Sequence, residues 1–257
     1  MIKNQILLQV FALLILSSCG NSSIKVEKRQ ESTIDSAQYI VDKAIASHGF
    51  DKLNGREISF AFRDKAYTAK YSDDGSFQFT RSFQKGDSLF RDVLTNSGIT
   101  RRIDDSLAEL SEEWQTKYSS SVNSVIYFAL LPYRLNDAAV VKEYLGSKNY
   151  AWKSYELVKI YFQEEGGGDD HEDEYVYWFN ADNMKLDHFA YNYLVDGGGV
   201  RFRTAFEAIE VEAMIFNQYL NYSCEDLDVP IETLLDSFML EKLQLLSQIS
   251  NKEIEVK

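Results

Sequence analysis

The sequence predicts an α+β fold in which a long antiparallel β meander packs against a few helices. Three observations lead to this prediction. Apolar and polar residues alternate with a period of two over many short segments. Tight turns rich in glycine and aspartate separate these segments, as in β-hairpins. Three other segments repeat apolar residues with the spacing of a helix.

The N-terminus predicts a bacterial lipoprotein signal. Lys3 precedes an apolar run, Ile6 to Leu16, that is too short to span a bilayer. The following LSSC resembles a lipobox, which implies cleavage before Cys19 and a diacylglyceryl group on its thiol. Residues 1–18 are then the signal peptide, and residues 19–31 are the lipidated cysteine and a flexible tether. The alternative is an ordinary secretory signal in which Cys19 is incidental.

The remaining residues, 32–257, predict a single domain, because they are numerous enough to enclose a core and contain no internal repeat. If Cys19 is acylated, Cys224 is the only free cysteine, which excludes a disulfide within the chain. Residues 20–23 carry no acidic cluster of the kind found in some surface-exported lipoproteins. We therefore expect an outer-membrane anchor with the domain facing the periplasm.

The charge of the chain excludes some partners. Its formal net charge is −13, and no basic patch or stripe is visible. This argues against nucleic acid as a partner and against electrostatic docking on anionic lipids. Contact with the membrane is therefore expected through the lipid on Cys19.

The first half of the domain predicts a helix followed by a meander. Ser32 to His48 has an apolar stripe at helical spacing, a possible capping box at its start, and Gly49 as a natural C-cap. The period then changes to two, with turns such as SDDGS and KGD between the apolar segments. Strands are expected over residues 58–63, 67–71, 77–83, 89–94 and 99–103.

Residues Leu110 to Leu135 predict a second helix, which Ser111 can cap and Pro132 ends. No charged residue other than Arg134 lies between Ser119 and Leu135. A helix that is apolar or small on all sides should be enclosed. Two placements are open: a core helix against the sheet, or a lid inside a concave sheet beside a cavity.

The second half predicts further strands and a last helix. Strands are expected over residues 155–162, 173–179, 185–195 and 200–211, and a helix from Ile231 to about Leu246. Tyr175 to Phe179 is apolar or aromatic on both faces. One face should pack on the core, and the other against the central helix or a ligand. His188, on the next strand, is expected to be half-buried and hydrogen-bonded, with a ligand role as the alternative.

Acidic residues gather at two glycine-rich turns that should lie at the same end of the sheet. Pairing across a turn at Ala181–Asp182 would place Asp170 near Tyr193 and His171 near Asn192. We therefore expect a common neighbourhood, which Arg201 and Arg203 enter from the next strand, for Asp169, Asp170, His171, Asp173 and Asp196. In one interpretation these are hairpin turns whose acids are solvated or paired with the arginines. In a second, the carboxylates bind Ca²⁺ or another divalent cation, although the spacing does not match an EF-hand. In a third, His171 and a carboxylate act as acid and base in hydrolysis.

Three stretches resemble a family of Bacteroidota envelope lipoproteins that has no established activity. They are KYSSSVNSVIYFALLPYRLND, GGGDDHEDEYVYWF and YLVDGGGVRFR. The order of helix, meander, central helices and further strands is also similar to the lipoprotein-localisation-factor fold. That second resemblance implies a strongly curved meander, a half-barrel, with helices packed in its concave face, where acyl chains are held.

We therefore expect an envelope lipoprotein that binds an apolar or amphipathic ligand, such as a lipid or acyl chain, between sheet and helices. The residues expected to line the pocket are Trp114, Tyr118, Val122, Ile126, Tyr127, Leu130, Tyr177 and Phe189. One rival is a metal-dependent hydrolase that uses the acidic turns, but no HExxH, GxSxG or CxxC motif supports catalysis. The other rival is a structural or partner-docking lipoprotein without a ligand, which should expose an apolar patch.

Overall fold

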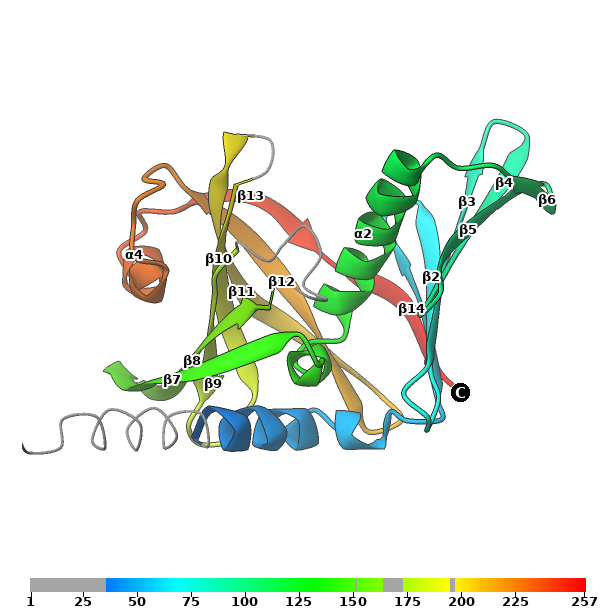
Figure 1. Cartoon of the computed structure of the whole chain (residues 1–257). Helices are drawn as coiled ribbons and strands as arrows, with labels where there is room; N and C mark the ends of the chain where they lie inside the picture. Colours follow the sequence, from blue (N-terminus) through cyan, green and yellow to red (C-terminus); the bar gives the residue numbers. More distant parts are fainter. Residues whose placement is uncertain (1–35, 151, 164–172, 195–196) are drawn as a thin grey trace, which may run out of the picture.

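The computed structural model describes residues 36–150, 152–163, 173–194 and 197–257. Within these residues the strands form two antiparallel sheets of seven strands each, with a few helices between and around them (Figure 1). The predicted α+β class is confirmed. No helix in this described part is long and apolar enough to cross a membrane.

The first sheet is the predicted meander. Its order is β14 (Asn251–Val256), β1 (Glu57–Phe62), β2 (Lys65–Tyr71), β3 (Phe77–Lys85), β4 (Ser88–Thr95), β5 (Gly98–Ile103) and β6 (Ser106–Ala108). All five strands predicted for this region are present. Tight turns connect them, and at one of these Gly86 has the positive φ of 62° that favours glycine.

The second sheet is a meander as well. Its order is β13 (Gln244–Ile249), β12 (Met214–Cys224), β11 (Gly199–Val211), β10 (Leu186–Tyr193), β9 (Tyr175–Asn180), β8 (Lys153–Phe162) and β7 (Val140–Tyr150). The four strands predicted here are present. Strands β7, β12 and β13 are additional, and β12 follows a hairpin turn, Glu212–Ala213, that contains no glycine.

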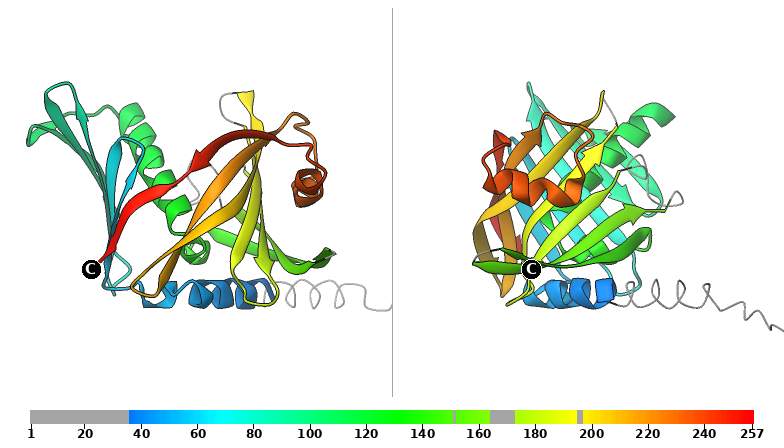
Figure 2. Two further views of the ribbon diagram at one scale, coloured as in Figure 1. Left: turned by 180° about the vertical axis from the view of Figure 1, so that it is seen from behind. Right: turned by 90° about the vertical axis from the view of Figure 1, so that its left-hand side faces the viewer.

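The C-terminal segment joins the two sheets. Strands β13 and β14 follow each other with only Ser250 between them, and β13 pairs with β12 while β14 pairs with β1. At the crossing, the backbone N–H of Asn251 donates to the side-chain oxygen of Gln218 at 2.6 Å. The segment runs from one sheet to the other (Figure 2), so the two meanders form one curved surface, as a half-barrel requires.

The predicted last helix is present in its first part, but it ends seven residues earlier than predicted. Only η5 (Ile231–Thr233) and α4 (Leu234–Met239) are helical, and Glu241 turns the chain with a left-handed φ of 56°. From Gln244 onward the chain pairs with β12. The apolar spacing suits a helix, but hydrogen bonds along a whole strand edge outweigh local propensity.

The helices lie on both sides of the second sheet. Helix α2 (Glu112–Ala129) lies between the two sheets, and the first helix, described over residues 36–47, runs along one end of the molecule (Figure 1). Both contribute to the core enclosed by the two sheets. Helix α4 lies instead on the outer face of the second sheet. The concave face therefore holds α2 and the first helix.

Strand β9 shows how both faces of the second sheet are buried. Tyr175, Tyr177 and Phe179 point into the core that contains α2, whereas Val176 and Trp178 contact the cluster beneath α4 and η5. The sequence predicted that the face of β9 opposite the core packs against the central helix or a ligand. The structure shows that the C-terminal helix α4, with η5, covers the face formed by Val176 and Trp178.

Candidate ligand pocket

Helix α2 is bound to the first sheet by a buried ion cluster. Asp92 accepts hydrogen bonds from the guanidinium groups of both Arg81 and Arg101, at 2.6 to 2.9 Å. Arg81 also donates to the hydroxyl of Ser121 on α2 at 2.7 Å, and the ring of Tyr118 lies 3.5 Å from the Arg101 guanidinium. Charge-assisted hydrogen bonds and a cation–π contact therefore position the middle of the helix.

A third arginine, Arg134, holds the C-terminal half of α2. Arg134, in η2 (Tyr133–Asn136), donates from Nε to Asp137 at 2.6 Å and from both Nη atoms to Asn123 on α2 at 3.2 Å. Its guanidinium also lies over the rings of Phe79 and Tyr127. The helix ends at Ala129, close to the predicted stop, and is fixed between the sheets.

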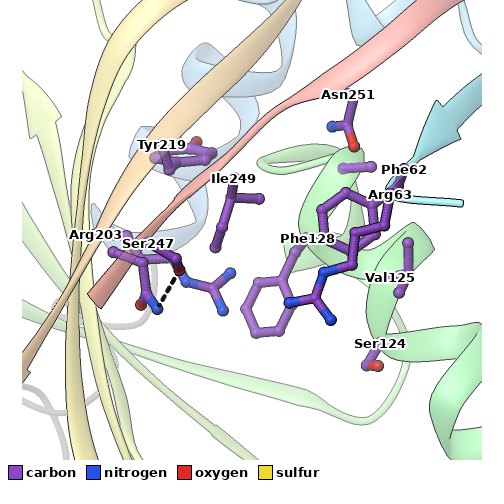
Figure 3. Close-up of a pocket in the computed structure, with 12 residues that line it drawn as sticks. Phe62, Arg63, Ser124, Val125, Phe128, Arg203, Tyr219, Ser247, Ile249 and Asn251 are labelled. Atoms are coloured by element: carbon purple, nitrogen blue, oxygen red, sulfur yellow. Dashed lines mark hydrogen bonds between the residues drawn. The ribbon is translucent and has the colours of Figure 1, made fainter. Parts of the chain in front are cut away.

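A pocket of about 290 Å³ opens where α2, the β1–β2 turn and the β13–β14 segment meet (Figure 3). Its apolar walls come from both sheets and from α2. They are formed by Phe62, Val125, Phe128, Ala129, Tyr219 and Ile249. The polar groups around it belong to Arg63, Ser124, Arg203, Asn221, Ser247 and Asn251. Apolar walls with a few polar groups are typical of a site for a small ligand.

Arg203 enters this pocket from strand β11 (Figure 3). Its side chain is buried, and its guanidinium lies 4.2 Å from the ring centre of Phe128 and 5.3 Å from those of Phe189 and Tyr191. One Nη donates to the hydroxyl of Tyr191 at 2.9 Å. Arg63 approaches from the exposed β1–β2 turn. The pocket therefore combines aromatic walls with positive charge.

A wider hollow of about 510 Å³ lies between the first helix, the β2–β3 turn and η2. Loop residues form much of its rim, including the carboxylates of Asp51, Asp73 and Asp137. Carboxylates at the rim make this hollow less suited to an apolar or anionic ligand than the pocket beside α2.

The eight residues predicted to line a pocket lie beside it or away from it, and none is among its lining residues. Six are buried in the filled core that α2 shares with the second sheet: Val122, Ile126, Tyr127, Leu130, Tyr177 and Phe189. There the hydroxyls of Tyr127 and Tyr177 are 3.4 Å apart. Tyr118 covers Arg101, and Trp114 is 47% exposed. The expectation that the whole helix is enclosed is therefore wrong, because its first turns face solvent.

Sequence reasoning missed the residues that do line the pocket. Val125 and Phe128 lie in the predicted helix, three positions apart on one face, but they were not among the eight residues expected to line a pocket. Ser247 and Ile249 lie just beyond the predicted last helix, where no strand was predicted, although β13 covers Gln244–Ile249. Its sequence, QLLSQI, does not alternate apolar and polar residues, so no local pattern indicates the strand.

The acidic cluster lies mostly outside the described residues. Asp169, Asp170, His171 and Asp196 belong to the undescribed segments, as does Cys19. Asp173 is described and is buried. In the part of the chain that is described, no group of three or more His, Cys, Asp or Glu side chains could hold a metal ion. The cation site and the hydrolase that would use it stay predictions.

The pairing of β9 with β10 differs from the predicted register. The sequence placed His171 near Asn192, but the backbone N–H of Asn192 donates to the carbonyl of Glu174 at 3.2 Å. The Asn192 side-chain oxygen in turn accepts from the Glu174 N–H at 2.9 Å. The turn between the strands is centred closer to Asn183 than to the predicted Ala181–Asp182, which shifts the register by three residues.

His188 is half-buried and hydrogen-bonded, as predicted. Its Nε2 lies 3.1 Å from the hydroxyl of Tyr155, and its ring stacks on Phe202 under α4. Burial lowers the pKa of His188 to about 4, so the imidazole is neutral at pH 7. It faces the outer cluster and not the pocket.

Comparisons with known proteins agree with this architecture. A family model described as "Family of unknown function (DUF6503)" matches residues 28–251. No curated protein matches the chain. A crystal structure of a DUF1329 family protein from Desulfovibrio piger has a TM-score of 0.50 and 11% identity, with 85% of this chain and 92% of that chain covered. At such identity the likeness concerns the fold alone.

Two further crystal structures are similar at a lower level. A LolA superfamily protein from Nitrosomonas europaea has a TM-score of 0.49 and 8% identity, with 86% of this chain and 91% of that chain covered. A putative outer membrane lipoprotein-sorting protein domain from Vibrio parahaemolyticus has a TM-score of 0.43 and 9% identity, with 74% and 86% covered.

Proposed function

The chain belongs to DUF6503, a family of unknown function, and we propose that it binds an apolar or amphipathic molecule in the pocket beside α2. The ligand class is a lipid or an acyl chain. The single observation that carries the proposal is the pocket of about 290 Å³ with aromatic and aliphatic walls at the junction of the two sheets. This volume is close to the lower end of the usual range for ligand sites, about 300 Å³, and favours one chain over two.

The proposed setting is the bacterial cell envelope. The LSSC stretch supports a lipid on Cys19, and residues 19–31 supply a polar tether to the domain. The anchor would hold the pocket near a membrane surface, from which an amphipathic ligand can be taken up. An outer-membrane position facing the periplasm is part of this proposal.

The test is whether the protein carries a bound molecule. The full chain would be purified gently, extracted with organic solvent, and the extract analysed by mass spectrometry. We expect an apolar or amphipathic molecule in stoichiometric amount with the wild type. Val125→Trp should remove it, because the larger ring fills the pocket from α2.

Leu107→Trp is the matched control, because Leu107 is exposed on β6, away from the pocket. This variant should retain the bound molecule. Extracts that contain no such molecule, or that contain the same amount of it after Val125→Trp, would overturn the proposed function.

A further inference from the structure

Arg203 differs from the other buried arginines of the described chain in having no carboxylate partner. The structure buries four arginines among these residues: Arg81, Arg101, Arg134 and Arg203. The first two share Asp92, and Arg134 pairs with Asp137. The guanidinium of Arg203 makes no ion pair with any described residue. The only hydrogen bond that it makes to these residues goes to the neutral hydroxyl of Tyr191. A buried charge without a counter-charge is costly unless something binds it.

The remaining donors of this guanidinium are free to bind a ligand. The Nε of Arg203 is buried and has no hydrogen-bond partner within the described residues. Phe128, Phe189 and Tyr191 surround the guanidinium, with ring centres 4.2 to 5.3 Å from its central carbon, and of the three only Tyr191 accepts a hydrogen bond from it. An arginine edge matches the two oxygens of a carboxylate or a phosphate.

A second unsatisfied polar group lies next to it. Asn221 on β12 is the direct cross-strand partner of Arg203 on β11, so the two side chains stand side by side on one face of the sheet. Asn221 donates from Nδ2 to the hydroxyl of Ser247 at 3.2 Å, while its Oδ1 is buried without a partner in the described structure. Arg203 and Ser247 line the pocket (Figure 3), and so does Asn221. Because an amide oxygen only accepts hydrogen bonds, the groups at this end of the pocket that can donate to an anion are the Arg203 guanidinium and the Ser247 hydroxyl.

We propose that the ligand of this pocket has an anionic head group, a carboxylate or a phosphate, which binds the edge of Arg203 beside Asn221 and Ser247. This inference rests on the proposed function. The tail of the ligand then lies along Phe128, Val125 and Ile249. The ligand class is a single-chain amphiphile with a negative head. Arg63, exposed at the β1–β2 turn, adds positive charge near the opening.

The first experiment compares head groups on one tail. The full chain with Cys19→Ser, which removes any protein-bound acyl group, would be titrated calorimetrically with dodecanoate, dodecyl phosphate, dodecanol and inorganic phosphate. We expect the two anionic amphiphiles to bind about tenfold or more tightly than dodecanol, because hydrogen bonds to a charged group contribute to affinity on this scale. Inorganic phosphate alone should bind far more weakly than dodecyl phosphate.

The second experiment tests the residue. Arg203→Gln should reduce the preference for dodecyl phosphate over dodecanol to less than about threefold while leaving the affinity for dodecanol nearly unchanged. Arg201→Gln is the matched control: it lies on the same strand, donates to the hydroxyl of Tyr193 and does not line the pocket. It makes the same change in net charge and should retain the preference. Comparison of the head groups on the wild type decides the question even if Arg203→Gln does not fold.

The outcomes separate the two proposals. Equal affinity of the wild type for dodecyl phosphate and dodecanol would overturn the anionic head group and leave the apolar pocket standing. No binding of any amphiphile would overturn the proposed function as well. Inorganic phosphate binding as tightly as dodecyl phosphate would mean that the site takes a free anion and not a lipid head group. A preference that survives Arg203→Gln would show that Arg203 is not the binding residue.

Discussion

His48 connects three parts of the chain through one neutral side chain. Its Nδ1 lies 3.2 Å from the carbonyl of Ile215, and its Nε2 lies 3.1 Å from the backbone N–H of Leu186. Nε2 must accept the second hydrogen bond, so Nδ1 carries the proton and donates to the carbonyl. Both ring positions are thus used in the neutral form. Burial lowers the pKa of His48 from 6.5 to about 4.

The depressed pKa predicts a loss of stability as the pH falls. The unfolded chain takes up a proton at His48 below pH 6.5, whereas the folded chain does so only near pH 4. The contribution of His48 is therefore complete above pH 6.5 and is lost as the pH falls to about 4. It amounts to about 3 kcal/mol in the free energy of unfolding. Burial also lowers the pKa of His188 to about 4, so His188 adds a loss of the same sign.

Urea unfolding at pH 7 and pH 4.5 measures this effect. His188→Phe should reduce the pH dependence of the free energy of unfolding, because it removes one titrating group. A phenylalanine ring can take its place among the aromatic rings of Phe202 and Phe238. His48→Phe should reduce the pH dependence too, but with a large loss at both pH values, because Leu186 and Ile215 lose their partner. If both variants keep the pH dependence of the wild type, groups other than His48 and His188 cause it.

Two features require glycine at position 49, at the end of the first helix: a left-handed backbone conformation and a closely packed neighbouring turn. Its φ is 75°, and a Cβ added there would lie 2.0 Å from the carbonyl oxygen of Ala213 in the β11–β12 turn. Gly75 is the matched control, since its φ is 80° but a Cβ there would meet nothing within 4 Å. The pair separates backbone strain from the cost of displacing a packed turn.

We expect Gly75→Ala to lower the free energy of unfolding by roughly 1 kcal/mol, the cost of a left-handed residue. Gly49→Ala should cost roughly 2 kcal/mol more, because the helix end and the turn must separate. Denaturant unfolding of both variants gives the difference. Equal losses would mean that the turn yields without cost and does not position the first helix.

Elements with strong local signals could be predicted from the sequence, and elements defined by distant pairing could not. Strands β1 to β5 have alternating side chains, three of the four turns between them contain glycine, and all five strands were predicted. Strand β12 was not, because Glu212 and Ala213 adopt positive φ values of 50° and 60° where glycine or asparagine is usual. Strands β13 and β14 exist because two separate sheets offer them open edges, which no local window of sequence contains.

The sequence predicted that an apolar site would lie beside the central helix, but it did not predict which residues line the pocket. An uncharged central helix opposite an aromatic strand indicated an apolar interior, and the helix does lie between the sheets. The pocket itself depends on where the C-terminal segment crosses, because Ser247, Ile249 and Asn251 form one wall. The missing charge partner of Arg203 is also a property of the folded chain, because it depends on which side chains surround the guanidinium.

At the scale of the whole molecule, the pairing of β14 with β1 holds the two sheets together and completes the pocket wall. Glu57 and Lys257 exchange two backbone hydrogen bonds, of 2.9 and 3.0 Å. In an antiparallel ladder every second pair is hydrogen-bonded, so Ile58 and Val256 form a non-hydrogen-bonded pair and Ser59 and Glu255 a hydrogen-bonded one, with the Glu255 N–H pointing at β1. The N–H of Val256 points away from β1.

Glu255→Pro should therefore weaken the junction, because proline removes this donor from a paired strand. We expect the free energy of unfolding to fall on the order of 2 kcal/mol and amide exchange to accelerate in β1 and β14 before it does in β9 to β11. Val256→Pro is the matched control and should leave exchange in β1 much closer to that of the wild type. If the two variants accelerate exchange equally, the hydrogen bond of Glu255 does not hold the sheets together. If only Glu255→Pro loses the ligand, the junction also keeps the pocket closed on that side.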